Sequence, residues 1–395
     1  MKYDLILFEH LHSAYNHRKD VLIIAKLLKK AGWKVAILDI YNDLGNISID
    51  GVSVLSLNFK GKVPDDKFIF KRQSKISRIF STLKYLYQQY IFMKNVSMEI
   101  KDKADSFYVG SYLFFPTTSF LKMNKPCFYW GLRSDRMHSF WKQIHSELLF
   151  QAPYLAFFKR SFLKNDKQML FVSNPIIMKE FISLGVPENR IIIREERPYT
   201  YPLVKVEKKS KGVKVFLVIG SLRIEKNVLL TIEAFKRANL SNAVLKIIGF
   251  CKNEDYEQQI ESAIKGVKNI IRKNCYINDK DFEKYFSEAD YVVFADEKSS
   301  CCITNGTLEE ALSHMTPIIA PNYDPYSYYM KENQIGFLYE PHNLSSYSMV
   351  LNEAYRTPIS VFQTSIEEHL KSIEFGNVAF KLDNQLRKVF NKDIK

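Results

Sequence analysis

The feature that most constrains the fold of this chain is an alternation of short apolar segments with amphipathic helical patterns, which occurs twice. In the first half we expect strands at residues 5–8, 34–40, 106–109, 127–130 and 168–173, and helices at 21–30 and 177–184. In the second half we expect strands at 213–219, 243–248, 291–295 and 316–320, and helices at 228–238, at 281–286 and from residue 307. Because such alternation is typical of parallel sheets, the sequence predicts an α/β chain with two Rossmann-like domains.

The domain boundary is expected between these two series. At 395 residues the chain is longer than a single hydrophobic core usually organises. The segment RPYTYPLVKVEKKSKGVK holds two prolines and is rich in lysine, which is typical of a linker. Two such domains form a cleft between the carboxyl ends of their strands, where ligands bind. The predicted parts are an N-terminal domain at 1–203, a linker at 204–212, a C-terminal domain at 213–364 and a helix at 365–395 that crosses back to the N-terminal domain.

Charge and cysteine content narrow the class of protein. A net charge of +14 attracts phosphorylated substrates, anionic lipids or nucleic acid, but no nucleic-acid-binding motif accompanies it. The five cysteines form no CxxC pair and no zinc-ligand spacing, which indicates reduced thiols, a cytoplasmic setting and no metal site. The N-terminal apolar run is too short for a signal peptide and contains Glu9, and no stretch reaches the apolar length of a membrane span.

The segment GSLRIEKN, residues 220–227, lies between a predicted strand and a predicted helix. Gly220 lets the backbone approach a ligand, and Arg223 and Lys226 place two cations at the strand end. Two cations suit a diphosphate leaving group, whose negative charge grows in the transition state. A solvated, basic helix start explains this segment equally well when it is considered alone.

Two further segments suit a nucleotide. In TNGTLEEAL, residues 304–312, Asn305 or Thr307 can cap a helix whose free N–H groups and dipole bind phosphate. Glu310 can then accept hydrogen bonds from a ribose, or it can form an ordinary capping box with Thr307. In CYIN, residues 275–278, the backbone at Ile277 can pair with a nucleobase edge while its side chain covers the base.

In order, the segments GSLRIEKN, LKIIGF, CYIND, EADYVVFAD and NGTLEEALSHMTPIIAP resemble the C-terminal half of the retaining GT-B glycosyltransferases of group 1, which include many bacterial polysaccharide enzymes. The resemblance covers roughly residues 213 to 340. It implies two Rossmann-like domains facing across a cleft. It also implies a nucleoside-diphosphate sugar as donor, a UDP- or GDP-sugar, with retention of configuration, no other cofactor and no obligatory metal.

The resemblance implies roles for individual residues. Lys226 matches the family's diphosphate-binding lysine, and Glu310 matches the second carboxylate of an E-x7-E element that holds the donor ribose. Catalytic roles are expected for Arg223, Lys226 and Glu310. The expected donor-binding residues are Gly220, Ile277, Asp296, Glu297, Asn305, Gly306 and Thr307.

The chain departs from the family pattern at three places. Arg223 lies two residues after the position of the family's arginine, so it would act from a shifted position. Cys302 stands where the first carboxylate of the E-x7-E element belongs, and Asp296 or Glu297 is expected to replace that carboxylate. The family's glycine-rich turn is replaced by NYDPY at 322–326.

The first domain offers candidates for the acceptor or for phosphate. The loop HLHSAYNHR after the first strand contributes His12 and Asn16, and the loop WGLRSDRMH contributes Arg133 and His138. Loops generally carry polar residues, so surface side chains without a ligand are the alternative. Residues 71–103 hold eight basic and two acidic residues, with an apolar helical face that runs from Ile76 to Ile91. This face either packs against its own domain or seats the protein on an anionic membrane.

The sequence therefore predicts a cytoplasmic glycosyltransferase that binds peripherally at the inner face of the membrane. It is expected to transfer a hexose from a nucleotide sugar to a glycan or glycolipid acceptor in surface polysaccharide biosynthesis. Two alternatives remain open: a nucleotide-sugar epimerase of the same fold, which needs no acceptor, and a catalytically degenerate binding subunit, which Cys302 favours.

Overall fold

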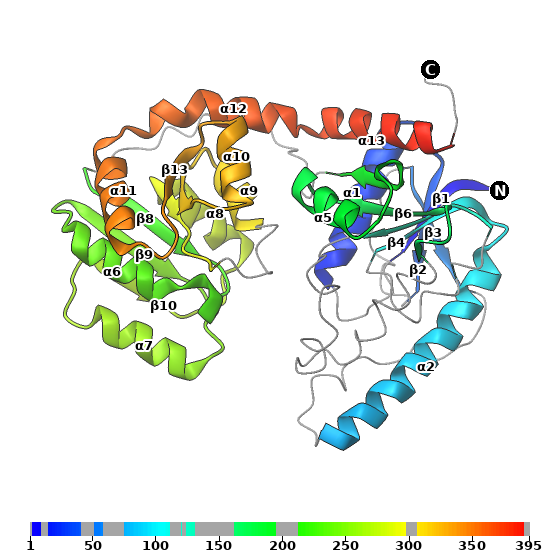
Figure 1. Cartoon of the computed structure of the whole chain (residues 1–395), viewed down its shortest axis with the longest axis horizontal. Coiled ribbons are helices and arrows are strands. Elements are labelled where there is room, and N and C mark those ends of the chain that lie inside the picture. The colour runs from blue at the N-terminus through cyan, green and yellow to red at the C-terminus, as the bar shows by residue number, and fades with distance from the viewer. Residues whose placement is uncertain are drawn as a thin grey trace. The chain divides into compact units, whose positions relative to one another are not determined.

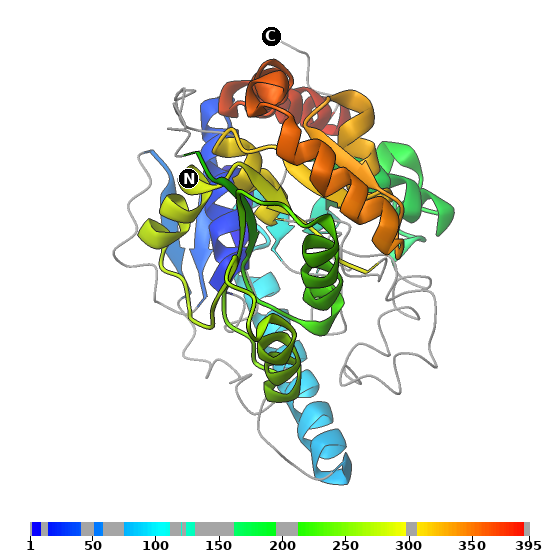
Figure 2. The same ribbon diagram turned by 90° about the vertical axis from the view of Figure 1, so that its left-hand side faces the viewer.

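The computed structural model describes residues 2–8, 15–40, 51–57, 75–110, 120, 124–130, 162–194, 212–297 and 306–390. The chain divides into two compact units, which Figures 1 and 2 show from two directions. Unit 1 consists of Met1–Glu196 and Phe375–Lys395, and unit 2 consists of Arg197–Glu374. Each unit is a parallel sheet with interleaved helices, so the predicted α/β class is confirmed.

Unit 1 contains a seven-stranded sheet in the order β3-β2-β1-β4-β5-β6-β7. Its strands, all parallel to their neighbours, are β1 (Tyr3–Phe8), β2 (Val35–Asp39), β3 (Ser53–Ser56), β4 (Ala104–Val109), β5 (Cys127–Trp130), β6 (Gln168–Val172) and β7 (Ile191–Ile193). The strands β2, β5 and β6 are buried along their whole length, as expected of parallel strands covered on both faces. Their continuous apolar runs are the reason that the sequence predicts them.

The helices of unit 1 are α1 (Tyr15–Lys30), α2 (Lys75–Ile100), α5 (Pro175–Ser183), the short 3-10 turn η6 (Glu188–Arg190) and α13 (Phe375–Phe390). Helix α5 shows why such an element begins where it does. The Asn174 side chain accepts hydrogen bonds from the N–H groups of Ile176 and Ile177, and Pro175 occupies the first helical position.

Helix α13 closes unit 1 although it comes last in the chain. It packs against α1 and against the edge strand β7 (Figure 1). The Gln385 side chain accepts a hydrogen bond from the Ile193 N–H at 2.9 Å and donates one to the Ile193 carbonyl at 3.0 Å. The Trp33 indole N–H donates to Asp383 at 2.6 Å. The amide of Gln385 thus takes the place that a further strand would occupy beside β7.

Helix α2 buries a different face from the one that the sequence suggests. Its buried side chains include Tyr85, Phe92 and Val96, whereas Tyr87 is 64% exposed and Ile91 is 39% exposed. The N-terminal part of the predicted apolar face, up to Leu83, lies outside the residues whose side chains the structure describes. Of the two alternatives for this face, packing against its own domain therefore does not hold for Tyr87 and Ile91.

Unit 2 contains a six-stranded sheet in the order β10-β9-β8-β11-β12-β13. Its strands, again all parallel, are β8 (Lys214–Ile219), β9 (Ala243–Ile248), β10 (Ile270–Lys273), β11 (Tyr291–Val293), β12 (Ile318–Pro321) and β13 (Gly336–Tyr339). The first strand of the unit, β8, is central, and the chain runs outward from it to β10 before returning to β11 on its other side. The strand order therefore reverses between β8 and β11.

The helices of unit 2 are η7 (Ile224–Lys226), α6 (Val228–Ala238), α7 (Glu254–Ile264), α8 (Asp279–Glu288), α9 (Gly306–Ser313), α10 (Tyr326–Glu332), α11 (Leu344–Arg356), η8 (Ile359–Phe362) and α12 (Gln363–Ser372). Helix α6 buries Val228, Ile232 and Phe235, which recur at helical spacing and pack into the core. The predicted tail helix is instead two helices, α12 in unit 2 and α13 in unit 1.

No helix in the described parts of the chain is both long enough and apolar enough to span a membrane.

Candidate functional site

A recess lies at the carboxyl end of the unit 2 sheet, where the strand order reverses. It is lined by Val218 and Ile219 of β8, by residues 292–296 at the end of β11, and by Lys226, Thr231 and Thr307. Its empty space, which is open to solvent, is about 270 Å³. Neighbouring strands whose connections run in opposite directions leave a crevice at their carboxyl ends, and α/β sheets bind ligands there.

Lys226 and Thr307 reach this recess from separate elements, η7 and α9. The Lys226 Nζ donates a hydrogen bond to the Ile219 carbonyl at 3.1 Å. Gly220, which follows β8, has φ +106°, a conformation that favours glycine. A Cβ atom built on Gly220 would lie 3.4 Å from Lys226 Nζ and 3.7 Å from Thr307 Oγ1. Gly220 and Lys226, from the segment at 220–227, thus lie around one point with Thr307, from the segment at 304–312.

Backbone contacts fix the Gly220 loop against the neighbouring loop that follows β9. The Gly220 N–H donates to the Ile248 carbonyl at 3.1 Å, and the Leu222 N–H donates to the Phe250 carbonyl at 2.9 Å. A Cβ atom on Gly249 would lie 1.9 Å from the Gly220 carbonyl oxygen, which is a severe clash. Only glycine at residue 249 therefore allows this close contact between the two backbones.

Asp296 lines the same recess and is held by two tyrosines. Its side chain is only 6% exposed, and the Tyr326 hydroxyl donates to its Oδ2 at 2.6 Å. The Tyr323 hydroxyl donates to its backbone carbonyl. Both tyrosines come from the NYDPY segment that replaces the family's glycine-rich turn. This departure from the family pattern therefore supplies the groups that orient a buried carboxylate in the recess.

Two more buried tyrosines lie behind the recess. The rings of Tyr339 and Tyr347 stack with centroids 3.8 Å apart, and the Tyr347 and Thr231 hydroxyls lie 3.1 Å apart. The Tyr339 hydroxyl donates to the Phe294 carbonyl at 3.0 Å. Burial raises the pKa of both Tyr339 and Tyr347 above that of a free tyrosine. The Tyr339 hydroxyl thus holds the Phe294 backbone, and the hydrogen bond between Tyr347 and Thr231 holds the Thr231 side chain, in the wall of the recess.

Helix α9 places the predicted phosphate-binding residues. It begins at Gly306, so Thr307 lies in its first turn rather than capping it. Glu310 is half-buried one turn later, and its backbone carbonyl accepts hydrogen bonds from Ser313 Oγ and His314 Nδ1, each at 2.8 Å. The start of α9 beside Lys226 provides the N–H groups and the positive dipole end that bind anions.

The remaining predicted residues of unit 2 lie on its surface or in its core. Arg223 is exposed and precedes η7. Glu297 is also exposed, and its N–H donates to the Glu225 carbonyl at 2.8 Å, which ties the end of β11 to the η7 turn. The Ile277 side chain packs against the core of unit 2. Neighbouring Tyr276, which the sequence did not single out, is 82% exposed.

Several candidates lie outside what the structure describes. These are His12, Arg133, His138 and Asn305, together with Cys302; Asn16 lies in α1, but its side chain is outside the described part. Among the described residues, no group of three or more His, Cys, Asp or Glu side chains is arranged to hold a metal ion.

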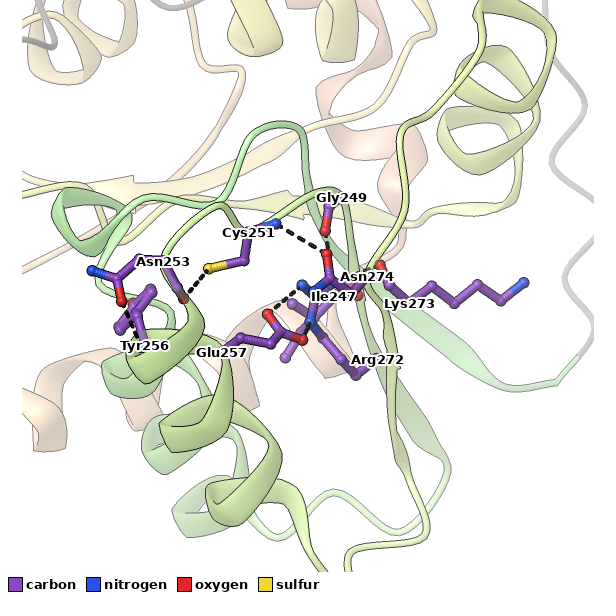
Figure 3. Close-up of polar contacts among 9 residues, drawn as sticks. All are labelled: Ile247, Gly249, Cys251, Asn253, Tyr256, Glu257, Arg272, Lys273 and Asn274. Atoms are coloured by element: carbon purple, nitrogen blue, oxygen red, sulfur yellow. Dashed lines mark hydrogen bonds and ion pairs between the residues drawn. The ribbon is translucent and has the colours of Figure 1, made fainter. Parts of the chain in front are cut away.

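A buried ion pair that sequence reasoning missed joins α7 to β10, beside the loop that follows β9 (Figure 3). Arg272 donates to both carboxylate oxygens of Glu257, at 3.0 and 2.7 Å, and to the Gly249 carbonyl at 2.9 Å. The Asn274 side chain accepts from the Cys251 N–H at 3.1 Å. Both charged side chains are almost fully buried. A bidentate, buried pair of this kind holds one geometry. Here it holds α7 against β10, while Arg272 also reaches the Gly249 carbonyl and Asn274 joins the loop after β10 to the loop after β9.

The chain is similar to known proteins, in sequence over its second half and in fold over nearly its whole length. Residues 203–367 match the family described as Glycosyl transferases group 1. Among curated protein sequences, none matches significantly. The fold is similar to that of the lipopolysaccharide outer core galactosyltransferase WaaB in its apo form, with 14% identity, a TM-score of 0.64, and 98% of this chain and 100% of that chain covered.

Two further structures share the fold. The sucrose-phosphate synthase of Thermosynechococcus elongatus is 14% identical with a TM-score of 0.67, and the match covers 99% of this chain and 100% of that chain. The HepE protein of Anabaena, in complex with UDP-glucose, is 13% identical with a TM-score of 0.62, and the match covers 98% of this chain and 99% of that chain. The fold is thus of the GT-B class, and the group 1 match makes the chain a glycosyltransferase.

Proposed function

We propose that this chain transfers a sugar from UDP- or GDP-sugar to a glycan or glycolipid acceptor in surface polysaccharide biosynthesis, with retention of configuration and without a metal ion. The group 1 match supports the reaction class. The similarity to a lipopolysaccharide galactosyltransferase and to a protein that binds UDP-glucose supports the nucleotide donor and the polysaccharide role.

The observation that carries this proposal is the meeting of Lys226, Thr307 and Gly220 at the strand switch point. An ammonium group and a helix N-terminus on one side of a recess suit the diphosphate of a donor. They stabilise the charge that develops on the leaving phosphate, which is the role a bound cation fills in metal-dependent transferases. Arg223, exposed at the same loop, adds positive charge to the mouth of the site.

Asp296 and Glu310 supply the two carboxylates that the E-x7-E element provides in the family. Glu310 lies one turn into α9, where a ribose attached to the diphosphate would reach it. Asp296 sits in the recess itself and accepts hydrogen bonds from the transferred sugar, in place of the carboxylate absent at Cys302. Glu297, the other candidate, is exposed and contributes its backbone to the η7 contact.

In the proposed step no side chain becomes covalently attached to the sugar. The bond between the anomeric carbon and the donor phosphate oxygen breaks, and the acceptor oxygen bonds to the same face of that carbon. The acceptor proton passes to the leaving phosphate. Lys226 lowers the barrier because its attraction to the phosphate grows as the bond breaks.

The test is Lys226→Ala, assayed by nucleoside diphosphate release from UDP- and GDP-sugars with and without acceptor. We expect a loss of about 10²–10³ in turnover, as for removal of one charge-stabilising group. Lys236→Ala, which removes a cation from the far end of α6, is the matched control and should keep activity. Normal turnover in Lys226→Ala would refute the proposal, and product formed from donor alone would indicate epimerisation.

We further propose that α2 places the enzyme on an anionic membrane. Its exposed face combines Lys84, Tyr87, Ile91, Lys94 and Met98 at helical spacing. Exposed aromatic and apolar groups flanked by lysines suit the headgroup region of an anionic leaflet. Flotation with vesicles containing phosphatidylglycerol tests this, since Lys84→Glu with Lys94→Glu should abolish binding. Binding that is the same on pure phosphatidylcholine would contradict the proposal.

A further inference from the structure

The excess of positive charge lies entirely in unit 1. This unit holds 35 lysines and arginines against 20 aspartates and glutamates, a net charge of +15, whereas unit 2 holds 22 against 23, a net charge of −1. The unit with the proposed donor site is thus close to neutral, although the donor is a diphosphate. A charge excess that the donor does not explain indicates a second anionic partner, and unit 1 is the part of the chain that would attract it.

An exposed stripe on α13 combines an aromatic ring with lysines. Phe380 is 65% exposed, the largest fraction among the large apolar side chains that the structure describes as exposed in unit 1. Lys381 is next to it, and Asn377 and Lys388 lie one turn before and two turns after Lys381, all of them exposed. The helix buries the side chains on its other side, so the stripe projects outward from unit 1.

Lysines at the end of α1 extend this stripe. Lys29 and Lys30 belong to the last turn of α1, Lys34 follows it, and all three are exposed. Helix α1 packs against α13 (Figure 1), and the Trp33 indole N–H donates to Asp383 of α13 at 2.6 Å. The end of α1 therefore meets α13 at one corner of unit 1. The α1–α13 basic face consists of Lys29, Lys30, Lys34, Phe380, Lys381 and Lys388.

The acidic residue of α13 is turned away from this face. The Asp383 side chain is 15% exposed, and its carboxylate accepts hydrogen bonds from Trp33 and, at 2.9 Å, from Arg387. Gln385 ties the same helix to the backbone of β7. The basic face thus stands on a helix that is fixed at several points. A rigid base reduces the entropy that a ligand must overcome when it binds.

This face is separate from that of α2, which we propose to lie on a membrane. Helix α1 connects β1 to β2 and α2 connects β3 to β4, in opposite directions along the sheet. Because such connections are right-handed, the two helices cover opposite faces of the sheet. A flat bilayer that contacts α2 therefore leaves the α1–α13 basic face in water, where its partner is a molecule in solution.

We propose that the α1–α13 basic face binds an acidic glycan, a sugar chain that carries carboxylates or phosphates. This inference rests on the proposed function, whose acceptor is a glycan or glycolipid, and assigns it an anionic character and a second binding surface. The lysines attract the acidic groups. The Phe380 ring packs against the C–H groups of a sugar, and the Asn377 amide can pair with its hydroxyls.

The position of the face suits a long chain. Lys34 directly precedes β2, so the face reaches the amino edge of the unit 1 sheet. Ligands of parallel α/β sheets bind at the opposite, carboxyl edge. The basic face would therefore hold a glycan at a distance from its reacting end and keep that end near the enzyme between transfers.

The test is isothermal titration of the full chain with oligogalacturonate, which carries a carboxylate on each sugar, and with neutral maltooligosaccharide. We expect oligogalacturonate to bind about 10-fold more tightly or better. Lys381→Glu combined with Lys388→Glu should weaken this binding about 10-fold or more, because attraction becomes repulsion. Lys265→Glu combined with Lys268→Glu makes the same charge change at exposed positions of unit 2 and is the matched control.

Phe380→Ala distinguishes a glycan from other polyanions. Loss of the ring should raise the Kd for oligogalacturonate about 5-fold and leave the Kd for polyglutamate unchanged. Phe380→Tyr keeps an aromatic ring and should bind oligogalacturonate as the wild type does. Equal effects of Phe380→Ala on both ligands, or an effect on neither, would overturn the assignment of a glycan.

The remaining outcomes concern the face and the proposed function separately. Unchanged oligogalacturonate binding after the Lys381 and Lys388 substitutions would overturn the face. So would binding to phosphatidylglycerol vesicles, but not to oligogalacturonate, that these substitutions abolish, because the partner would then be a membrane. The α13 variants should bind UDP as the wild type does. A wild-type protein that binds oligogalacturonate but neither UDP nor GDP would overturn the donor site and leave the basic face.

Discussion

Lys226 and Thr307 flank the same point in space, because a methyl group on Gly220 would touch the Nζ of the first and the Oγ1 of the second at 3.4 and 3.7 Å. One residue follows the first strand of unit 2 and the other begins a helix that follows the fourth strand. A cation and a helix N-terminus are thus brought together by the reversal of strand order, and the absence of a side chain at Gly220 keeps the space between them open.

Gly220→Ala tests this arrangement. Alanine at φ +106° is strained, and its methyl group would crowd Lys226 and Thr307. We expect a loss of stability of about 1–3 kcal/mol and a larger loss of donor affinity, measured by thermal denaturation and by UDP titration. Gly266→Ala is the matched control, since Gly266 also has a positive φ, of +78°, but has nothing near its Cβ position. Equal donor affinities in the two variants would contradict the crowding.

Asp296→Asn and Tyr326→Phe test the buried carboxylate. If Asp296 holds the transferred sugar, Asp296→Asn should weaken binding of a UDP-sugar about 10-fold and leave UDP binding unchanged, because UDP lacks the sugar. Tyr326→Phe removes the donor to Oδ2 and should produce a smaller loss of the same kind. Tyr339→Phe, whose hydroxyl contacts Phe294, is the control. Should Asp296→Asn lose UDP and UDP-sugar equally, the residue acts on the fold and not on the sugar.

The buried ion pair makes a prediction about stability. Glu257→Gln leaves Arg272 buried without a counter-charge, which should cost about 3–5 kcal/mol in the free energy of unfolding. Glu288→Gln breaks the more exposed pair with Lys246, where N and O lie 2.8 Å apart, and should cost at most about 1 kcal/mol. Denaturant titration of the whole chain, followed by circular dichroism, measures both. Similar costs for the two variants would show that burial of the Arg272–Glu257 pair does not matter.

Cys127 predicts how stability varies with alkaline pH. Burial raises the pKa of this thiol from 9.0 to about 12. Between these values the unfolded chain releases the proton and the folded chain keeps it, so the free energy of unfolding falls as pH rises. The contribution of this one group is up to about 1.4 kcal/mol per pH unit. Melting temperatures measured from pH 8 to 11 should fall less steeply for Cys127→Ala than for the wild type.

Two comparisons complete the alkaline test. Cys275→Ala removes a thiol that is only partly buried and should leave the slope of the wild type unchanged. Buried tyrosines such as Tyr129, whose pKa burial also raises, add to the fall above pH 10 in all three proteins. Identical slopes for Cys127→Ala and the wild type would show that the thiol ionises equally in the folded and unfolded chains.

The predictable part of the fold follows from burial. Strands such as β5 and β6 are covered on both faces, so their apolar runs stand out in the sequence. The strand β10 reads IIRK, and only Ile270 is buried, because it is an edge strand whose Arg272 reaches an ion pair. No local pattern distinguishes such a strand from a loop, and the sequence did not predict it.

The same reasoning applies to the candidate site. Short motifs at the ends of strands and helices contain Gly220, Lys226 and Thr307. Such motifs can be recognised from a few consecutive residues. The contact of Tyr326 with Asp296 joins residues thirty positions apart, and the Glu257–Arg272 pair joins a helix to a strand. Such long-range contacts depend on the spatial order of the strands and helices, and a single sequence does not predict this order. The sequence likewise does not tell which of Tyr276 and Ile277 is exposed. The structure shows that Ile277 packs against the core and that Tyr276 is exposed.

The amide of Gln385 beside Ile193 has a consequence for biosynthesis. Most of unit 1 is synthesised before unit 2, yet the edge of its sheet is completed by a helix that is translated after all of unit 2. A nascent or truncated chain that ends before Phe375 leaves the β7 backbone and the Trp33 ring uncovered. Helix α13 therefore serves as the closing element of unit 1, and this unit cannot reach its native state before the chain has been synthesised beyond unit 2.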